Sequence, residues 1–191
     1  MSAMYFTSDT HFSHKKILQY ESRPFTSVDE MDEALINIWN ATIQPLDEVF
    51  HLGDFSLGSV EQTISILRRL NGKIHLIQGN HDLNKKWDII RKENLIESFH
   101  PVGIELTYNK HRMWLTHYPL GIGLRPRKWS ISGHIHSMDN QEFNQINVGV
   151  DAKLWKHKPF GQPISMMELW EVMEGRTPEI EELFQSRKQS H

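Results

Sequence analysis

The sequence contains no cysteine among its 191 residues. This absence excludes disulfide bonds, catalysis by a thiolate, and zinc or iron–sulfur sites held by cysteine. Any metal ion must therefore be bound through nitrogen and oxygen atoms. A chain without cysteine also suits a reducing compartment, so we expect a cytoplasmic protein.

Long hydrophobic runs and an excess of positive charge are also absent. No apolar stretch approaches the roughly 20 residues that a membrane-spanning helix needs, and the start of the chain does not resemble a signal peptide. We therefore expect no membrane association. The chain has 21 Lys and Arg against 24 Asp and Glu, a net charge of −3, which argues against long nucleic acid as a partner. The sequence carries no signal for an oligomeric state.

No repeat, low-complexity tract or linker divides the chain, and 38% hydrophobic residues suffice for one core. We therefore expect a single domain over residues 1–191, in which the polar residues 185–191 form a frayed tail. Strand and helix patterns alternate through residue 78, which is typical of parallel strands in an α/β fold. Residues 102–108 and 111–116 then predict a hairpin, and with it a second, more antiparallel sheet.

Helix starts and ends are marked by local signals. Ser27 with Glu30, and Ser59 with Gln62, have the spacing of capping boxes. They predict one helix over residues 28–42 and another that begins near residue 60. A closing amphipathic helix is expected over residues 165–174.

The unusual feature is twelve histidines, several of which follow strand patterns together with acidic residues. The carboxyl ends of strands in an open α/β sheet carry the functional loops, so side chains there can converge. A single metal ion would not use all the candidate ligands, whereas two ions about 3.5–4 Å apart that share a carboxylate would. Asp54 is the expected bridge. The candidates are Asp9, His11, Asp54, Asn80, His117, His134 and His136.

Five blocks of residues carry a resemblance to the calcineurin-like metallophosphoesterase family. The chain contains D-x-H at Asp9, G-D at Asp54, G-N-H-D from Gly79, a lone His117 and G-H-x-H from Gly133, in the family's order. The resemblance implies a four-layer αββα sandwich of two mixed sheets flanked by helices, with the metal site at the carboxyl ends of the strands. No cap domain fits in the remaining residues.

The resemblance also implies which residues serve each metal. The first metal would take Asp9, His11, Asp54 and His136, and the second would take Asp54, Asn80, His117 and His134. His81 would face the substrate as a phosphate contact or general acid, oriented by Asp82. Imidazole and carboxylate ligands suit Mn, Fe, Co, Ni or Zn, and the resemblance favours Mn(II).

The expected function is hydrolysis of a small phosphorylated substrate at a dinuclear metal centre. We expect a phosphodiesterase for a nucleotide-like or other small phosphodiester, in which a hydroxide that bridges the metals attacks phosphorus in line. A phosphomonoesterase and a nuclease are alternative enzymes. A catalytically silent metal-binding scaffold is the alternative from another class.

Further residues are candidates for substrate binding. His14 follows His11 by one helical turn, and Arg23 lies in the loop after the first block. The Gly/Pro-rich loop 118–129 could bind further phosphates or could be an ordinary solvated loop, and both readings stay open. Its cations are Arg125, Arg127 and Lys128. We expect His51 to be a core histidine and Asp151 to be a turn former.

Overall fold

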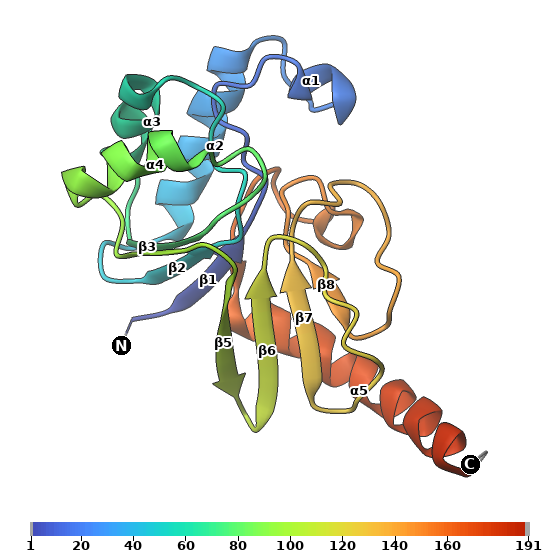
Figure 1. Cartoon of the computed structure of the whole chain (residues 1–191). Helices are drawn as coiled ribbons and strands as arrows, with labels where there is room; N and C mark the ends of the chain where they lie inside the picture. The colour runs from blue at the N-terminus through green and yellow to red at the C-terminus, as the bar shows by residue number, and fades with distance from the viewer. Residues whose placement is uncertain (1, 190–191) are drawn as a thin grey trace.

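The structure is a computed structural model that describes residues 2–189. Its first sheet has the strand order β4-β3-β2-β1-β9, of which Figure 1 labels β3, β2 and β1. The first four strands in the chain pair in parallel, and β9 is antiparallel to β1. The strands are β1 (Met4–Thr7), β2 (Glu48–His51), β3 (Lys73–Ile77), β4 (Ser98–His100) and β9 (Ile164–Ser165).

The second sheet contains β5 (Gly103–Tyr108), β6 (His111–Thr116), β7 (Lys128–Ser132) and β8 (Gln145–Asn147), in that order. The predicted hairpin is confirmed, because β5 and β6 pair antiparallel. However, β6 with β7 and β7 with β8 pair in parallel. The second sheet is thus mixed, and it is more antiparallel than the first, as expected, although only the hairpin pairs in that way. Loop 117–127 is long enough to return the chain to the starting end of the sheet, so β7 begins beside the start of β6.

The helices are α1 (Ile17–Tyr20), α2 (Val28–Thr42), α3 (Val60–Leu67), α4 (Asn84–Ile90) and α5 (Met166–Gln189). The Ser59–Gln62 capping box is complete, and α3 begins where it predicts. Ser27 caps α2 by accepting from the Glu30 backbone N–H, but the Glu30 carboxylate binds Thr26 instead of closing the box. α5 extends far beyond the expected helix, so residues 185–189 are helical, while residues 190 and 191 lie outside the described part of the chain.

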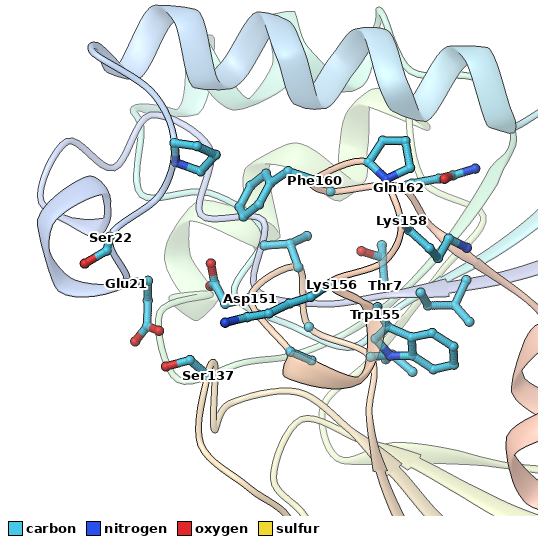
Figure 2. Close-up of a pocket in the computed structure, with 18 residues that line it drawn as sticks. Thr7, Glu21, Ser22, Ser137, Asp151, Trp155, Lys156, Lys158, Phe160 and Gln162 are labelled. Atoms are coloured by element: carbon cyan, nitrogen blue, oxygen red, sulfur yellow. The ribbon is translucent and has the colours of Figure 1, made fainter.

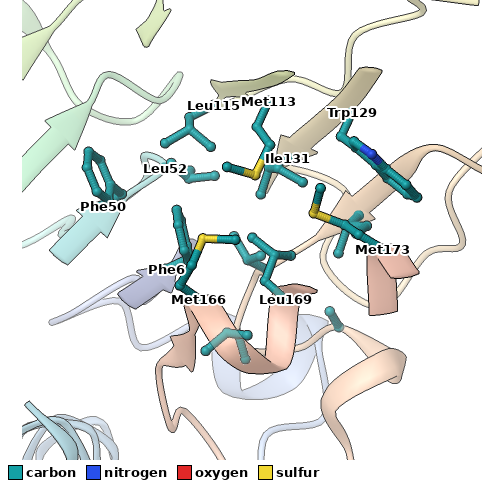
Figure 3. Close-up of a cluster of buried hydrophobic side chains, with 14 of the residues drawn as sticks. Phe6, Phe50, Leu52, Met113, Leu115, Trp129, Ile131, Met166, Leu169 and Met173 are labelled. Atoms are coloured by element: carbon teal, nitrogen blue, oxygen red, sulfur yellow. The ribbon is translucent and has the colours of Figure 1, made fainter. Parts of the chain in front are cut away.

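Each face of the first sheet is buried in its own core. Helices α2, α3 and α4 cover one face, where Trp39 and Trp87 pack with Val49 and Leu76 of the strands. The other face packs against the second sheet and α5. Figure 3 shows this core, formed by Phe6, Phe50, Leu52, Met113, Leu115, Trp129, Ile131, Met166, Leu169 and Met173.

The predicted α/β fold of two mixed sheets flanked by helices is therefore confirmed. Two short 3₁₀ helices, Arg91–Glu93 and Lys153–Trp155, complete the regular structure of residues 2–189. Among residues 2–189, no helix combines the length and the apolar character needed to cross a membrane.

His51 at the end of β2 is fully buried, as expected of a core histidine. Its Nε2 lies 2.9 Å from Thr10 Oγ1, and its Nδ1 has no hydrogen-bond partner among the described residues. Burial lowers the pKa of His51 to about 3, although the nearby Asp54 carboxylate opposes the shift. The folded protein therefore keeps this imidazole neutral where an unfolded chain would protonate it.

This difference predicts a loss of stability on acidification. Below about pH 6.5 the unfolded state binds a proton that the folded state does not, so the free energy of unfolding should fall by roughly 1–2 kcal/mol between pH 6.5 and 5 through His51 alone. His51→Phe should remove that part of the loss. Urea unfolding of chelator-treated protein at several pH values measures it, and identical pH dependence in both proteins would contradict the assignment.

Candidate metal centre

The loops that follow β1, β2, β6 and β7 are joined by short hydrogen bonds. The Asp9 N–H donates to the Gly53 carbonyl at 3.0 Å, and the Gly133 N–H donates to the His117 carbonyl at 3.1 Å. The His134 N–H donates to Asp9 Oδ2 at 2.9 Å, which joins the two sheets. The strand ends named from the sequence therefore meet at one place.

The backbone at this place is unusual. L-amino acids with a side chain rarely adopt positive φ, because Cβ then approaches the backbone. Here the left-handed region is occupied by Asp9 (57°), His11 (49°), Asp54 (55°), His134 (69°) and His136 (46°). All of them are predicted metal ligands, and strained backbone of this kind gathers at functional sites.

Asp9, His11 and His136 place ligand atoms within 4.8 Å of one another. His11 Nε2 is buried, has no hydrogen-bond partner among residues 2–189, and lies 3.6 Å from Asp54 Oδ2. Burial lowers the pKa of His11 to about 2, so its imidazole is neutral, as a metal ligand must be. An unpaired buried nitrogen beside a carboxylate fits a bound cation.

Asp9 also forms a second group with Asp54 and His117. His117 Nδ1 donates to the Leu52 carbonyl at 2.8 Å, so Nε2 is the nitrogen that could bind a metal, and it lies 3.5 Å from Asp54 Oδ2. Burial opposes ionisation of Asp54, but the contacts with His117 outweigh it and lower the pKa of Asp54 to about 2. Asp54 is thus a carboxylate that both groups of residues share.

Asn80 lies on the same side as His117. Its Oδ1 is 2.9 Å from His117 Nε2 and 3.0 Å from His134 Nδ1. The structure therefore brings together all the side chains that the sequence named as ligands, with Asp54 between the His11 and His117 groups.

Two glycines explain how the loops approach so closely. A Cβ on Gly79 would lie 2.2 Å from Asp54 Oδ1, and a Cβ on Gly133 would lie 1.9 Å from Ser8 Oγ. No side chain fits at either position. The glycines of the G-N-H and G-H-x-H blocks are therefore required by the packing around the carboxylates.

His81 and His14 lie at the edge of the centre. The His81 side chain is 45% exposed, and its Nε2 is 4.0 Å from Asp54 Oδ2. Its backbone N–H donates to Asp54 Oδ1 at 2.8 Å. The His14 ring lies 5.2 Å from the His11 ring and 6.4 Å from the His81 ring. Both positions are compatible with contact to a substrate.

Asp82 has a different role from the one predicted. Its carboxylate is fully buried and accepts from the N–H groups of Asp54 at 2.7 Å and Gly79 at 2.9 Å. It also accepts from the Phe55 N–H and from Trp87 Nε1. None of these donors is the His81 imidazole, so the prediction that Asp82 orients His81 was wrong. Side chains of consecutive residues diverge, and Asp82 instead joins the loops after β2 and β3.

Arg23 is not available to a substrate, so the prediction that it binds substrate is corrected. Its guanidinium is buried and binds Asp151 through two hydrogen bonds of 3.0 and 2.8 Å. It also donates to the carbonyls of Asp9 and Thr10 at 2.7 and 2.8 Å. A buried guanidinium with these hydrogen bonds holds the loop that follows β1 in place.

Asp151 likewise does more than form a turn. Its Oδ2 lies 2.9 Å from His136 Nδ1, an arrangement that fixes the imidazole and leaves Nε2 for a metal. The sequence reading missed this residue, although it follows the apolar run 148–150 as the other acidic residues follow theirs. Asp151 also borders a cavity of about 250 Å³, together with Glu21, Ser22, Lys156 and Phe160 (Figure 2).

The cations of loop 118–129 lie away from the centre, which favours the reading of an ordinary solvated loop over that of a substrate-binding loop. Lys128 begins β7 and pairs with Arg112 at the start of β6, whereas His117 and His134 follow the other ends of these strands. The Arg125 guanidinium lies over the Phe184 ring of α5 at 5.0 Å, and the Arg127 carbonyl accepts from the Arg112 N–H.

The contacts of Asp82 predict a structural role. Asp82→Asn replaces one acceptor oxygen by a donor and leaves buried N–H groups unpaired, so the free energy of unfolding should fall by roughly 2–4 kcal/mol. Asp88→Asn, a change at an exposed carboxylate on α4, is the matched control and should alter stability by less than about 0.5 kcal/mol. Denaturant unfolding measures both, and equal stabilities for the two variants would refute the role.

Comparisons with known proteins agree with this geometry. Residues 3–155 match the model of the calcineurin-like phosphoesterase superfamily domain. An uncharacterized protein of Methanocaldococcus jannaschii is 33% identical over 168 residues, which cover 83% of this chain and 86% of that protein. The gene 66 protein of Mycobacterium phage L5 is 26% identical over 210 residues, or 91% of this chain and 95% of that protein.

A solved structure extends the likeness to the fold. The crystal structure of a protein of unknown function from Aquifex aeolicus superposes with a TM-score of 0.67 over 90% of this chain and 100% of that one, at 24% identity. At this identity the likeness shows the fold alone. The match to the family model, which spans most of the sequence, shows the membership: the chain belongs to the calcineurin-like phosphoesterase superfamily.

Proposed function

We propose that this protein is a metal-dependent phosphodiesterase for small phosphodiesters. One observation carries the proposal. Asp54 Oδ2 lies 3.6 Å from His11 Nε2 and 3.5 Å from His117 Nε2, so one ionised carboxylate lies between two groups of potential metal ligands. This is the arrangement that two divalent cations sharing a carboxylate require.

The ligand set divides into two groups. Asp9, His11, Asp54 and His136 would hold one cation, and Asp54, Asn80, His117 and His134 would hold the other. Imidazole and carboxylate donors suit Mn, Fe, Co, Ni or Zn, and membership of the family favours Mn(II). When bound, the cations supply an activated water and neutralise charge that develops on the phosphate.

The chain itself supplies a proton donor. His81 stands at the exposed edge of the centre, and its backbone N–H is fixed on Asp54 Oδ1. As an imidazolium, it would bind a phosphate oxygen or donate a proton to the departing ester oxygen. Asp82 contributes indirectly, since it fixes the loops that carry Asp54 and His81.

The contacts that the basic residues make within the protein favour a substrate with one phosphate. Arg23 is fully engaged by Asp151 and two carbonyls, and Arg125 lies against α5. Neither is available to neutralise further phosphates or the second charge of a monoester. A diester carries one charge, which suits a centre whose positive charge comes mainly from its metals.

The proposal predicts metal-dependent cleavage of bis(4-nitrophenyl) phosphate after metal-stripped protein receives Mn(II). His81→Ala should lower kcat by about 10²–10⁴-fold while the metal content persists, because only the proton donor is lost. Asp54→Ala should lose both activity and metal. His157→Ala, at an exposed histidine elsewhere, is the control and should retain full activity.

The outcomes separate the alternatives. Cleavage of 4-nitrophenyl phosphate alone would replace the diesterase by a phosphomonoesterase. A preference for single-stranded oligonucleotides over both nitrophenyl substrates would indicate a nuclease. Absence of all hydrolysis in protein that holds two metal ions would favour the silent scaffold.

Asp151 provides a test of the metal assignment itself. Asp151→Asn weakens the acceptor that fixes His136, so it should reduce affinity for one of the two ions by about 10–100-fold. Asp139→Asn, at an exposed carboxylate that binds Lys153, is the matched control. Competition with a chromogenic chelator measures both affinities. Unchanged binding of both ions by Asp151→Asn would overturn the assignment of His136 as a ligand.

A further inference from the structure

Tyr118 stands beside the candidate metal centre and is not one of its predicted ligands. It directly follows His117, is 51% exposed, and its ring lies 4.5 Å from the His134 ring and 5.1 Å from the His117 ring. An exposed aromatic ring against two ligand side chains offers a stacking surface at the edge of the centre.

A cavity of about 350 Å³ opens next to Tyr118. Pro119, Ile135 and Met138 give it apolar walls, while Asp139 and Glu142 add carboxylates. The described residues that line it include no lysine or arginine, so the cavity is unsuited to a phosphate group. A planar, uncharged group would fill it better.

The carboxylates of this cavity differ in their pairing. Asp139 binds Lys153 Nζ at 2.9 Å. Glu142 Oε2 is buried and has no hydrogen-bond partner among the residues that the structure describes. The two carboxylates make the cavity acidic, which suits a ring that carries amino groups better than a phosphate.

The position of His81 indicates which part of a substrate would enter the cavity. The His81 ring lies 5.4 Å from the ring of His11 and 6.4 Å from that of His14, whereas Tyr118 contacts His134 and His117. A proton donor belongs beside the departing oxygen. A substituent that stays on phosphorus would then extend away from His81, on the side of Tyr118.

We propose that the cavity beside Tyr118 binds the retained substituent of a phosphodiester, an uncharged aromatic ring of the nucleobase type. This inference rests on the proposed diesterase function. In the reaction, the water oxygen bonds to phosphorus, the bond from phosphorus to the leaving oxygen breaks, and that oxygen takes a proton. The aromatic group remains in the cavity as part of the phosphomonoester product.

Two substrates with the same leaving group test the proposal. Bis(4-nitrophenyl) phosphate and methyl 4-nitrophenyl phosphate both release 4-nitrophenol, but they retain an aromatic ring and a methyl group, respectively. Tyr118→Ala should lower kcat/KM for the first about tenfold, the loss expected from one stacking contact, and change the second less than twofold. Tyr118→Phe should behave like the wild type, since the ring remains.

Tyr20→Ala is the matched control, because Tyr20 is also exposed but contacts His14 on the other side. It should leave the ratio of the two kcat/KM values unchanged. Product binding gives a second readout: phenyl phosphate should inhibit the wild type more strongly than methyl phosphate, and Tyr118→Ala should remove the difference. An unchanged ratio in an active Tyr118→Ala enzyme would overturn this inference alone, whereas an inactive wild type would overturn the proposed function.

Discussion

The candidate centre depends on left-handed backbone at five of its seven predicted ligands, from Asp9 to His136. Such conformations cost of order 1–3 kcal/mol each and persist only where surrounding structure enforces them. Buried hydrogen bonds provide that enforcement. Asp82 holds the amides of Asp54 and Gly79, and Arg23 holds the carbonyls of Asp9 and Thr10. The residues that fix the ligands thus matter as much as the ligands.

The same packing gathers buried groups whose charges need a counterpart. Burial raises the pKa of Asp9 to about 6, although His136 and His117 oppose the shift. His11 stays neutral for the same reason, and its Nε2 remains unpaired. Divalent cations would ionise Asp9 and satisfy His11 together, so metal binding and the stability of these loops are coupled.

Much of this arrangement was predictable from the sequence, because strand ends and helix caps are local signals. The Ser59–Gln62 box predicted α3, and the polar residues after each apolar run predicted the centre. Partners far apart in the chain were not predictable in that way. Arg23 reaches Asp151 across the fold, and Asp82 reaches the β2 loop instead of its neighbour His81. The parallel pairing of β6 with β7 was not predicted either, because the sequence of loop 117–127 does not show to which end of the sheet the chain returns.

The central claim is that Asp54 joins two divalent cations. Anomalous X-ray diffraction from crystals soaked in Mn(II) tests it most directly. We expect two anomalous peaks about 3.5–4 Å apart on either side of the Asp54 carboxylate, one near His11 and His136, the other near His117 and His134. A single peak away from Asp54, or no peak at saturating Mn(II), would contradict the account.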